Sequence, residues 1–95
     1  MLENMNNYSI FDHVIWNAIP DGIFIFNQKV SETTFLEYPY HHIIEILSEQ
    51  NLISSMDLKK NWLAMLPNDL PLDIDTFYDN AILTLLQQQI IKNTH

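Results

Sequence analysis

The sequence predicts a small α+β domain in which a three-stranded antiparallel sheet is followed by three helices. In the first half, short apolar and β-branched runs are separated by turn residues, which is typical of strands. In the second half, apolar residues recur three and four positions apart, which is typical of helices. We expect the 95 residues to form one domain, 1–95, with residues 1–7 loosely ordered.

Three runs are expected to form the sheet. Residues 13–18 alternate between larger apolar and other side chains, and residues 20–22, Pro-Asp-Gly, follow as a turn in which glycine permits a positive φ. Residues 23–26, IFIF, are apolar on both faces, which favours a central strand. A polar link, 27–32, leads to the third β-prone run, 33–37. This order predicts a meander.

Three helices are expected after the sheet. The first begins after Pro39, and its apolar stripe is Tyr40, Ile43, Ile44 and Leu47. Ser54 or Ser55 is expected to cap the second. The third begins at Asp73 or Asp75 and is expected to continue to Lys92. We expect Trp16 and Trp62 to anchor the core because large aromatic side chains dominate small cores.

Charge and composition narrow the function. Twelve carboxylates stand against four lysines and no arginine, so the net charge is −8. Such a chain repels phosphate groups, which argues against nucleic-acid and membrane-surface partners. The absence of cysteine excludes disulfides and thiolate chemistry. The N-terminus lacks the pattern of a signal peptide, and no apolar run approaches a membrane span, so we expect a cytoplasmic protein.

No residue pattern indicates an enzyme, a metal site or a cofactor. The neighbouring His41 and His42 would point about 100° apart on a helix, so we expect no shared metal ion. Ser54 and Ser55 lack the GxSxG context of a nucleophile, and the chain has no glycine-rich loop to hold a phosphate. We therefore expect a non-enzymatic binding protein.

The order and spacing of the elements resemble the PqqD-like peptide chaperones, which are also called recognition elements for ribosomally made, modified peptides. The resemblance covers residues 13–92 and includes IFIFN, TTFL, IIEIL, ISSMDLKKNWLAML and LLQQQII. No single motif is specific. The sequence departs from the family at Tyr40-His41-His42, where many members have small residues, and in the 27–32 link, which lacks the usual glycine. These departures affect which subfamily the chain resembles more than they affect the predicted fold.

The resemblance implies a winged-helix-like fold and a mechanism. In that family a precursor's leader peptide adds as a strand beside the third strand, in a groove against the third helix, and is presented to a modifying enzyme. The corresponding edge residues here are Thr33, Thr34, Phe35, Leu36 and Glu37. The corresponding wall residues are Phe77, Tyr78, Ala81, Leu85 and Gln88, with one of Phe77 and Tyr78 facing the groove. We also infer that Asp73, Asp75 and Asp79 favour a basic peptide.

Three alternatives remain open. A small acidic domain can act as an inhibitor or immunity protein that blocks a partner enzyme, although the acidic residues are spread along the sequence. A winged-helix DNA reader has a similar shape, but the lack of arginine argues against it. An open sheet edge can also pair with a second copy of the chain and form a homodimer.

Overall fold

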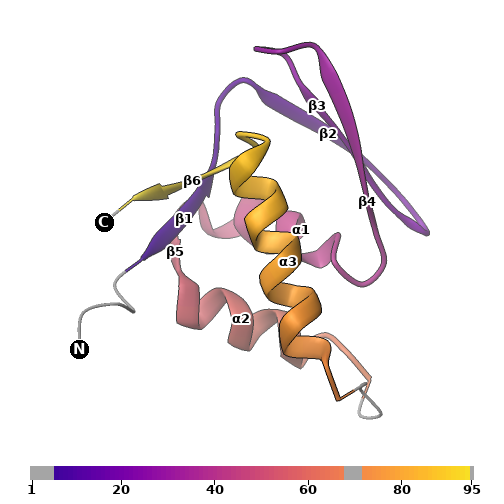
Figure 1. Ribbon diagram of the computed structural model, residues 1–95, viewed down its shortest axis with the longest axis vertical. Coiled ribbons are helices and arrows are strands. Elements are labelled where there is room, and N and C mark those ends of the chain that lie inside the picture. Colours follow the sequence, from indigo (N-terminus) through magenta and orange to yellow (C-terminus); the bar gives the residue numbers. More distant parts are fainter. Residues whose placement is uncertain (1–5, 68–71, 95) are drawn as a thin grey trace.

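The computed structural model describes residues 6–67 and 72–94 and has an α+β fold with two small antiparallel sheets (Figure 1). The first sheet has the order β2-β3-β4 and contains β2 (Val14–Ile19), β3 (Gly22–Asn27) and β4 (Glu32–Glu37). The second has the order β5-β1-β6 and contains β5 (Ile53–Ser54), β1 (Asn7–Ile10) and β6 (Ile91–Thr94). The helices are α1 (His42–Gln50), α2 (Ser55–Ala64) and α3 (Ile74–Gln87).

The first sheet confirms the predicted meander, with β3 in the centre. The prediction of a single sheet followed by three helices is wrong, because β1 precedes the meander, β5 lies between α1 and α2, and β6 follows α3. Asn7, which we expected to be loosely ordered, pairs with both Ser54 and Thr94; residues 1–5 lie outside the described chain. The second sheet joins the two ends of the described chain.

The end of α3 also differs from the prediction. The helix ends at Gln87, five residues before Lys92, and Gln89 has a φ of 58°. The Ile90 N–H donates to the Leu85 carbonyl at 3.0 Å, and the Gln89 N–H donates to the Leu86 carbonyl at 3.1 Å. This is a Schellman motif, which turns the chain out of the helix and into β6.

Gly22 is needed for a different reason from the one predicted. No described glycine has a positive φ. A Cβ atom on Gly22 would lie 2.5 Å from the carbonyl oxygen of Leu36 and 2.7 Å from the Phe35 ring. Glycine therefore allows β4 to approach the start of β3 closely.

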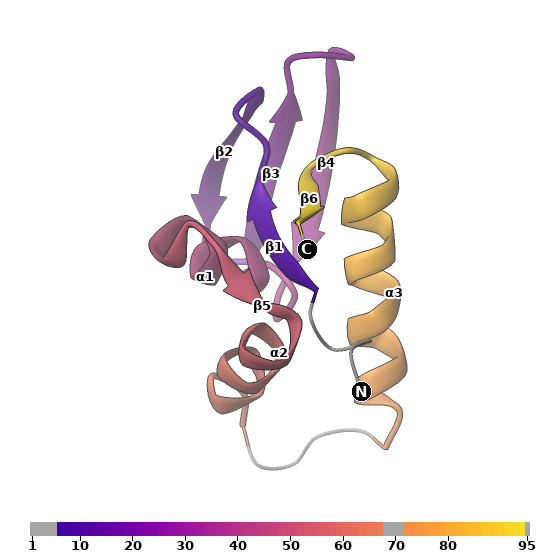
Figure 2. The same cartoon turned by 90° about the vertical axis from the view of Figure 1, so that its left-hand side faces the viewer.

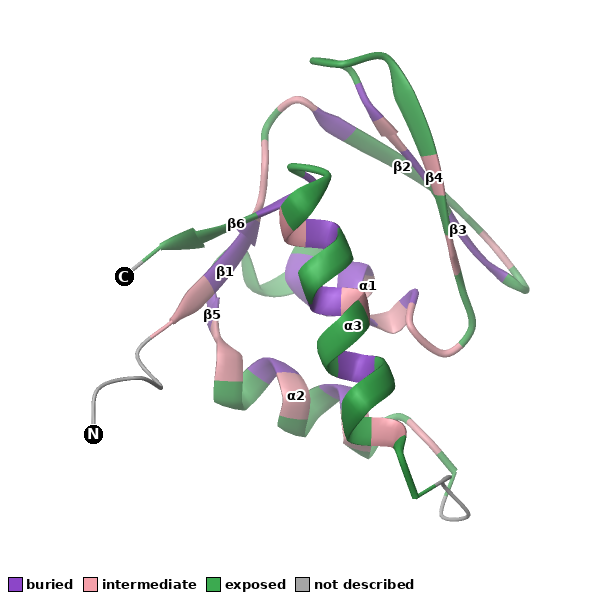
Figure 3. Cartoon of the chain, in the orientation of Figure 1, coloured by how far each residue is buried: buried purple, intermediate pink, exposed green. Residues whose placement is uncertain are grey.

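The core lies between the inner face of β3 and the three helices (Figure 3). Ile23 and Ile25 of β3 are fully buried, as is Trp62 of α2. Trp16 of β2 is instead 39% exposed, so the expectation that it anchors the core is wrong. β2 is an edge strand, and of its inner side chains Val14 is buried whereas Trp16 and Ala18 are exposed.

The start of α2 confirms the predicted cap. The Ser54 side chain accepts a hydrogen bond from the Asp57 N–H at 3.1 Å, as expected at an N-cap. Its sequence neighbour Ser55 is the first residue of the helix. Among the helices of the described chain, none is long and apolar enough to cross a membrane.

Candidate functional site

β4 is an edge strand beside α3. In the described part of the chain it pairs only with β3. Figure 2 shows β4 as the strand of this sheet that lies nearest to α3, and a hydrogen bond between Thr34 and Gln88 agrees with this. The predicted third strand therefore lies at an edge of its sheet, and no other described strand pairs with that edge.

The register shows which backbone groups of β4 face outward. The Tyr38 N–H donates to the Asp21 carbonyl at 2.9 Å, which extends the β3–β4 ladder by one pair. Because the direction of backbone groups alternates along an antiparallel strand, Leu36 and Thr34 also point toward β3. Thr33, Phe35 and Glu37 then point away from it. These three residues, and not all five predicted, supply the open backbone edge.

Only one of the two backbone groups of Glu37 is open to a bound peptide. Its carbonyl accepts hydrogen bonds from the N–H groups of Tyr40 and His41, at 2.8 and 3.2 Å, as the chain turns into α1. Thr33 and Phe35 thus present both their N–H and C=O groups outward, whereas Glu37 presents only its N–H. The edge that a peptide can bind therefore ends before the carbonyl of Glu37, the last residue of β4.

One stripe of α3 faces this edge. The Thr34 hydroxyl donates a hydrogen bond to the Gln88 side-chain oxygen, which places the end of α3 beside β4. Counting back from Gln88 at helical spacing gives Thr84, Ala81 and Phe77 on the same side of the helix. Three of these four were predicted wall residues. Thr84 was missed because it is polar and does not extend the apolar pattern.

The other two predicted wall residues are part of the core. Tyr78 is 4% exposed and Leu85 is fully buried. The Tyr78 ring packs against Trp62 of α2 with ring centroids 4.9 Å apart, so it faces α2 and not β4. Burial raises the pKa of Tyr78, with smaller contributions from Tyr8 and Asp79. Of the pair Phe77 and Tyr78, only Phe77 is on the β4 side.

Two of the three acidic residues named for α3, Asp75 and Asp79, lie on the opposite side from this stripe. Asp75 forms an ion pair with Lys59 of α2 at 3.1 Å. Asp79 lines a surface hollow between α3, α2 and β1, together with Tyr8 and Ile82. At helical spacing these carboxylates are about half a turn away from Phe77 and Ala81. Asp73, the N-cap of α3, lies four positions before Phe77 and so on the side of the stripe. Our inference that these carboxylates favour a basic peptide is therefore supported for Asp73 alone.

The solvent face of the first sheet is apolar, a feature that the sequence analysis missed. Phe24 of β3 and Phe35 of β4 are cross-strand neighbours with ring centroids 4.9 Å apart, and both are exposed. Ile15 of β2 and Phe26 of β3 continue this surface and line a shallow hollow on it. The IFIF run is apolar on both faces and forms the central strand, as predicted, but only its Ile23 and Ile25 face is buried.

A buried amide holds the sheet against the end of α3. The side chain of Asn27, which is almost fully buried, donates to the backbone carbonyl of Gln88 at 2.9 Å. Its oxygen accepts from the Lys29 N–H at 3.0 Å and so shapes the β3–β4 turn. Gln88 is thus bonded to β3 through its backbone and to β4 through its side chain.

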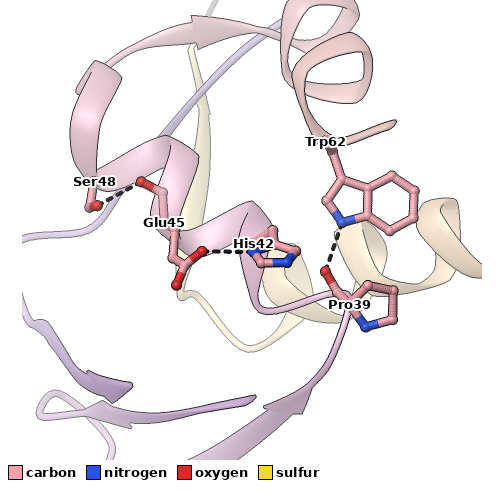
Figure 4. Close-up of polar contacts among 5 residues, drawn as sticks. All are labelled: Pro39, His42, Glu45, Ser48 and Trp62. Carbon is pink, nitrogen blue, oxygen red and sulfur yellow. Dashed lines mark hydrogen bonds and ion pairs between the residues drawn. The ribbon is translucent and has the colours of Figure 1, made fainter. Parts of the chain in front are cut away.

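The turn after β4 is held by side chains of α1 and α2 (Figure 4). The Trp62 indole N–H donates to the Pro39 carbonyl at 2.9 Å. Next to this turn, the His41 and His42 rings lie 4.1 Å apart, and with Glu45 they form a group that can hold a metal ion. The two imidazoles do not diverge as expected, because His41 precedes α1 and the ring centroids lie 4.1 Å apart.

Comparison of the chain with models of protein families, with curated proteins and with solved structures finds no match.

Proposed function

We propose that this protein is a non-enzymatic peptide-binding domain that captures a precursor's leader peptide by β-strand addition to β4 and presents it to a modifying enzyme. The observation that carries the proposal is the open edge of β4, with Thr33 and Phe35 facing outward beside the stripe of α3 that ends at Gln88. In such complexes, main-chain hydrogen bonds supply affinity and alternate side chains supply specificity.

The residues on the two faces beside the β4 edge indicate which side chains a bound peptide would carry. Side chains on one face of an added strand would extend the exposed Phe24–Phe35 surface, so an apolar residue is favoured there. Side chains on the other face would point toward Phe77 and Ala81 of α3, where the small side chain of Ala81 leaves room for a larger one. We therefore expect a short extended segment that is apolar at successive positions.

The experiment is an NMR titration of isotope-labelled protein with leader peptides encoded beside its gene. We expect the largest amide shifts at Thr33, Phe35 and Glu37, with further shifts along Phe77 to Gln88. The proposal is wrong if no such peptide shifts these signals, or if the shifts fall on the β2 edge or on the α2 side of α3. Sedimentation of the free protein tests whether a second copy of the chain already fills the edge.

A matched pair of substitutions separates the α3 wall from general effects of charge. Ala81→Glu places a carboxylate on the stripe that faces β4, and we expect it to weaken peptide binding at least tenfold. Leu83→Glu makes a comparable change at an exposed position of the same helix that faces away from β4, and we expect no loss. Equal loss in both variants would contradict a binding site at this wall.

A further inference from the structure

Three metal-ligating side chains meet at the start of α1. His41 precedes the helix, His42 is its first residue and Glu45 lies one turn later. One potential ligand atom from each lies within 4.8 Å of the other two. The Nδ1 atom of His42 is 2.7 Å from Glu45 Oε1, and Figure 4 shows the imidazole and the carboxylate pointing toward each other.

A second observation concerns His41 alone. His41 is only 5% exposed, and its Nδ1 atom has no hydrogen-bond partner among the described residues. Buried ring nitrogens almost always have a partner. The cluster therefore has an unsatisfied nitrogen at its buried side.

We propose that His41, His42 and Glu45 form a binding site for a divalent transition-metal ion of the Zn²⁺ class. Two imidazoles and one carboxylate are a known ligand set for zinc sites that keep a fourth, open position. Imidazole ligands favour Zn²⁺, Cu²⁺ or Ni²⁺, whereas Mg²⁺ and Ca²⁺ prefer oxygen ligands. Two imidazoles and one carboxylate therefore favour a transition-metal ion over Mg²⁺ or Ca²⁺.

The geometry requires only a small adjustment. At metal–ligand distances of about 2.0–2.2 Å, the ligand atoms of a tetrahedral site lie about 3.3 Å apart. The atoms here already lie within 4.8 Å, and the Glu45 side chain is 40% exposed, so a small change of its rotamer would bring them closer. An ion would reach the site from solvent, because His42 and Glu45 are only partly buried. His41 is buried and lies on the core side of the site.

The competing explanation is an ordinary ion pair between residues three positions apart on a helix. It accounts for the contact between His42 and Glu45, but it leaves His41 Nδ1 unsatisfied. This inference does not depend on the proposed peptide binding.

The test is a titration of the full, untagged chain with Zn²⁺ after removal of metals by a chelator. We expect one ion per chain by calorimetry, a rise in melting temperature, and visible Co²⁺ absorption typical of a four-coordinate site. Glu45→Gln and His42→Ala should each weaken binding roughly tenfold or more. Because Glu45 is at the surface, its variant is expected to fold normally, and circular dichroism checks both.

His13→Ala is the matched control, since His13 lies away from the cluster and contacts the Gln89 carbonyl. We expect it to bind Zn²⁺ as the wild type does. The proposal is overturned if Zn²⁺ does not bind at 100 μM, or if Glu45→Gln binds it as tightly as the wild type. It is also overturned if His13→Ala weakens binding as much as His42→Ala, because the ion would then be held nonspecifically by surface histidines.

Discussion

The Thr34 hydroxyl donates a hydrogen bond to the side-chain oxygen of Gln88, and this bond joins the edge strand β4 to the end of α3. The two residues are 54 positions apart in the sequence. The backbone carbonyl of the same Gln88 accepts from Asn27 of β3 at 2.9 Å. One residue thus sets how far the open edge stands from the helix that would form the wall of a peptide site.

Replacing Thr34 by valine tests this contact, because valine keeps the shape and removes the hydroxyl. We expect a loss of about 0.5–1.5 kcal/mol in the free energy of unfolding, measured by urea denaturation. Thr33→Val is the control, since Thr33 is on the solvent face of the same strand. A double-mutant cycle with Gln88→Ala should give a coupling energy for Thr34 and none for Thr33.

Two proline substitutions separate the outward and inward backbone of β4. Phe35→Pro removes an N–H that points away from β3, so we expect the fold to persist and peptide binding to fall at least tenfold. Leu36→Pro removes an N–H of the β3–β4 ladder, and we expect a loss of about 3 kcal/mol or more in stability. Circular dichroism and a binding titration distinguish them. Full binding by a folded Phe35→Pro variant would rule out strand addition at β4.

The end of α3 offers a stabilising change. Gln89 has a φ of 58°, a conformation that costs a non-glycine residue about 1–2 kcal/mol. Glycine adopts it without that cost but has more freedom in the unfolded chain, so we expect Gln89→Gly to raise the free energy of unfolding by about 0.5–1 kcal/mol. Thermal and urea unfolding measure it. Gln87→Gly, at the last residue of α3 and without a positive φ, should instead destabilise the protein, by up to about 1 kcal/mol.

The features that the sequence predicted well are those with local signals. The order of β2, β3 and β4 followed from turn residues, and the Ser54 cap followed from its place before a helical stripe. The second sheet was missed because β1 and β6 have four residues each and β5 has two, and they are strands only through pairing between distant parts of the chain. The true end of α3 was missed because its left-handed residue is Gln89 and not glycine.

The candidate site was predicted only in part for a related reason. Phe77 and Tyr78 are adjacent and both aromatic, so the apolar pattern of α3 does not show which one faces the core. Packing against Trp62 decides this for Tyr78. Likewise, the sequence does not show that the backbone groups of Thr33 and Phe35 point outward, because this depends on the register of β4 against β3. The hydrogen bond from Tyr38 to Asp21 fixes that register.

Gly22→Ala should destabilise the first sheet. Its Cβ atom would lie 2.5 Å from the Leu36 carbonyl oxygen, and a backbone atom at that distance cannot move without shifting β4. We expect a loss of about 1–3 kcal/mol, measured by urea denaturation. Because the clash falls on β4, the amide signals of Leu36 and Glu37 should shift most. An unchanged stability would show that the two strands are not packed as closely as described.

Tyr78→Phe tests the buried hydroxyl of the core. The Tyr78 hydroxyl has no hydrogen-bond partner within the described chain, and burial raises the pKa of Tyr78 above its usual value of 10.0. At neutral pH we therefore expect the variant to be as stable as the wild type or more so. Above pH 10, the unfolded chain loses the proton that the folded protein keeps, so wild-type stability should fall by up to about 1.4 kcal/mol per pH unit from this group.

The variant removes that contribution, so its stability should fall less steeply. The pKa values of Tyr8 and Tyr40 are also raised by burial, and both residues remain in the variant, so the difference between the two proteins isolates Tyr78. Urea denaturation at about pH 7 and about pH 11 measures it. Parallel losses in the two proteins would show that the Tyr78 hydroxyl reaches solvent, and that the contact between α3 and α2 is looser than the packing of Tyr78 against Trp62 indicates.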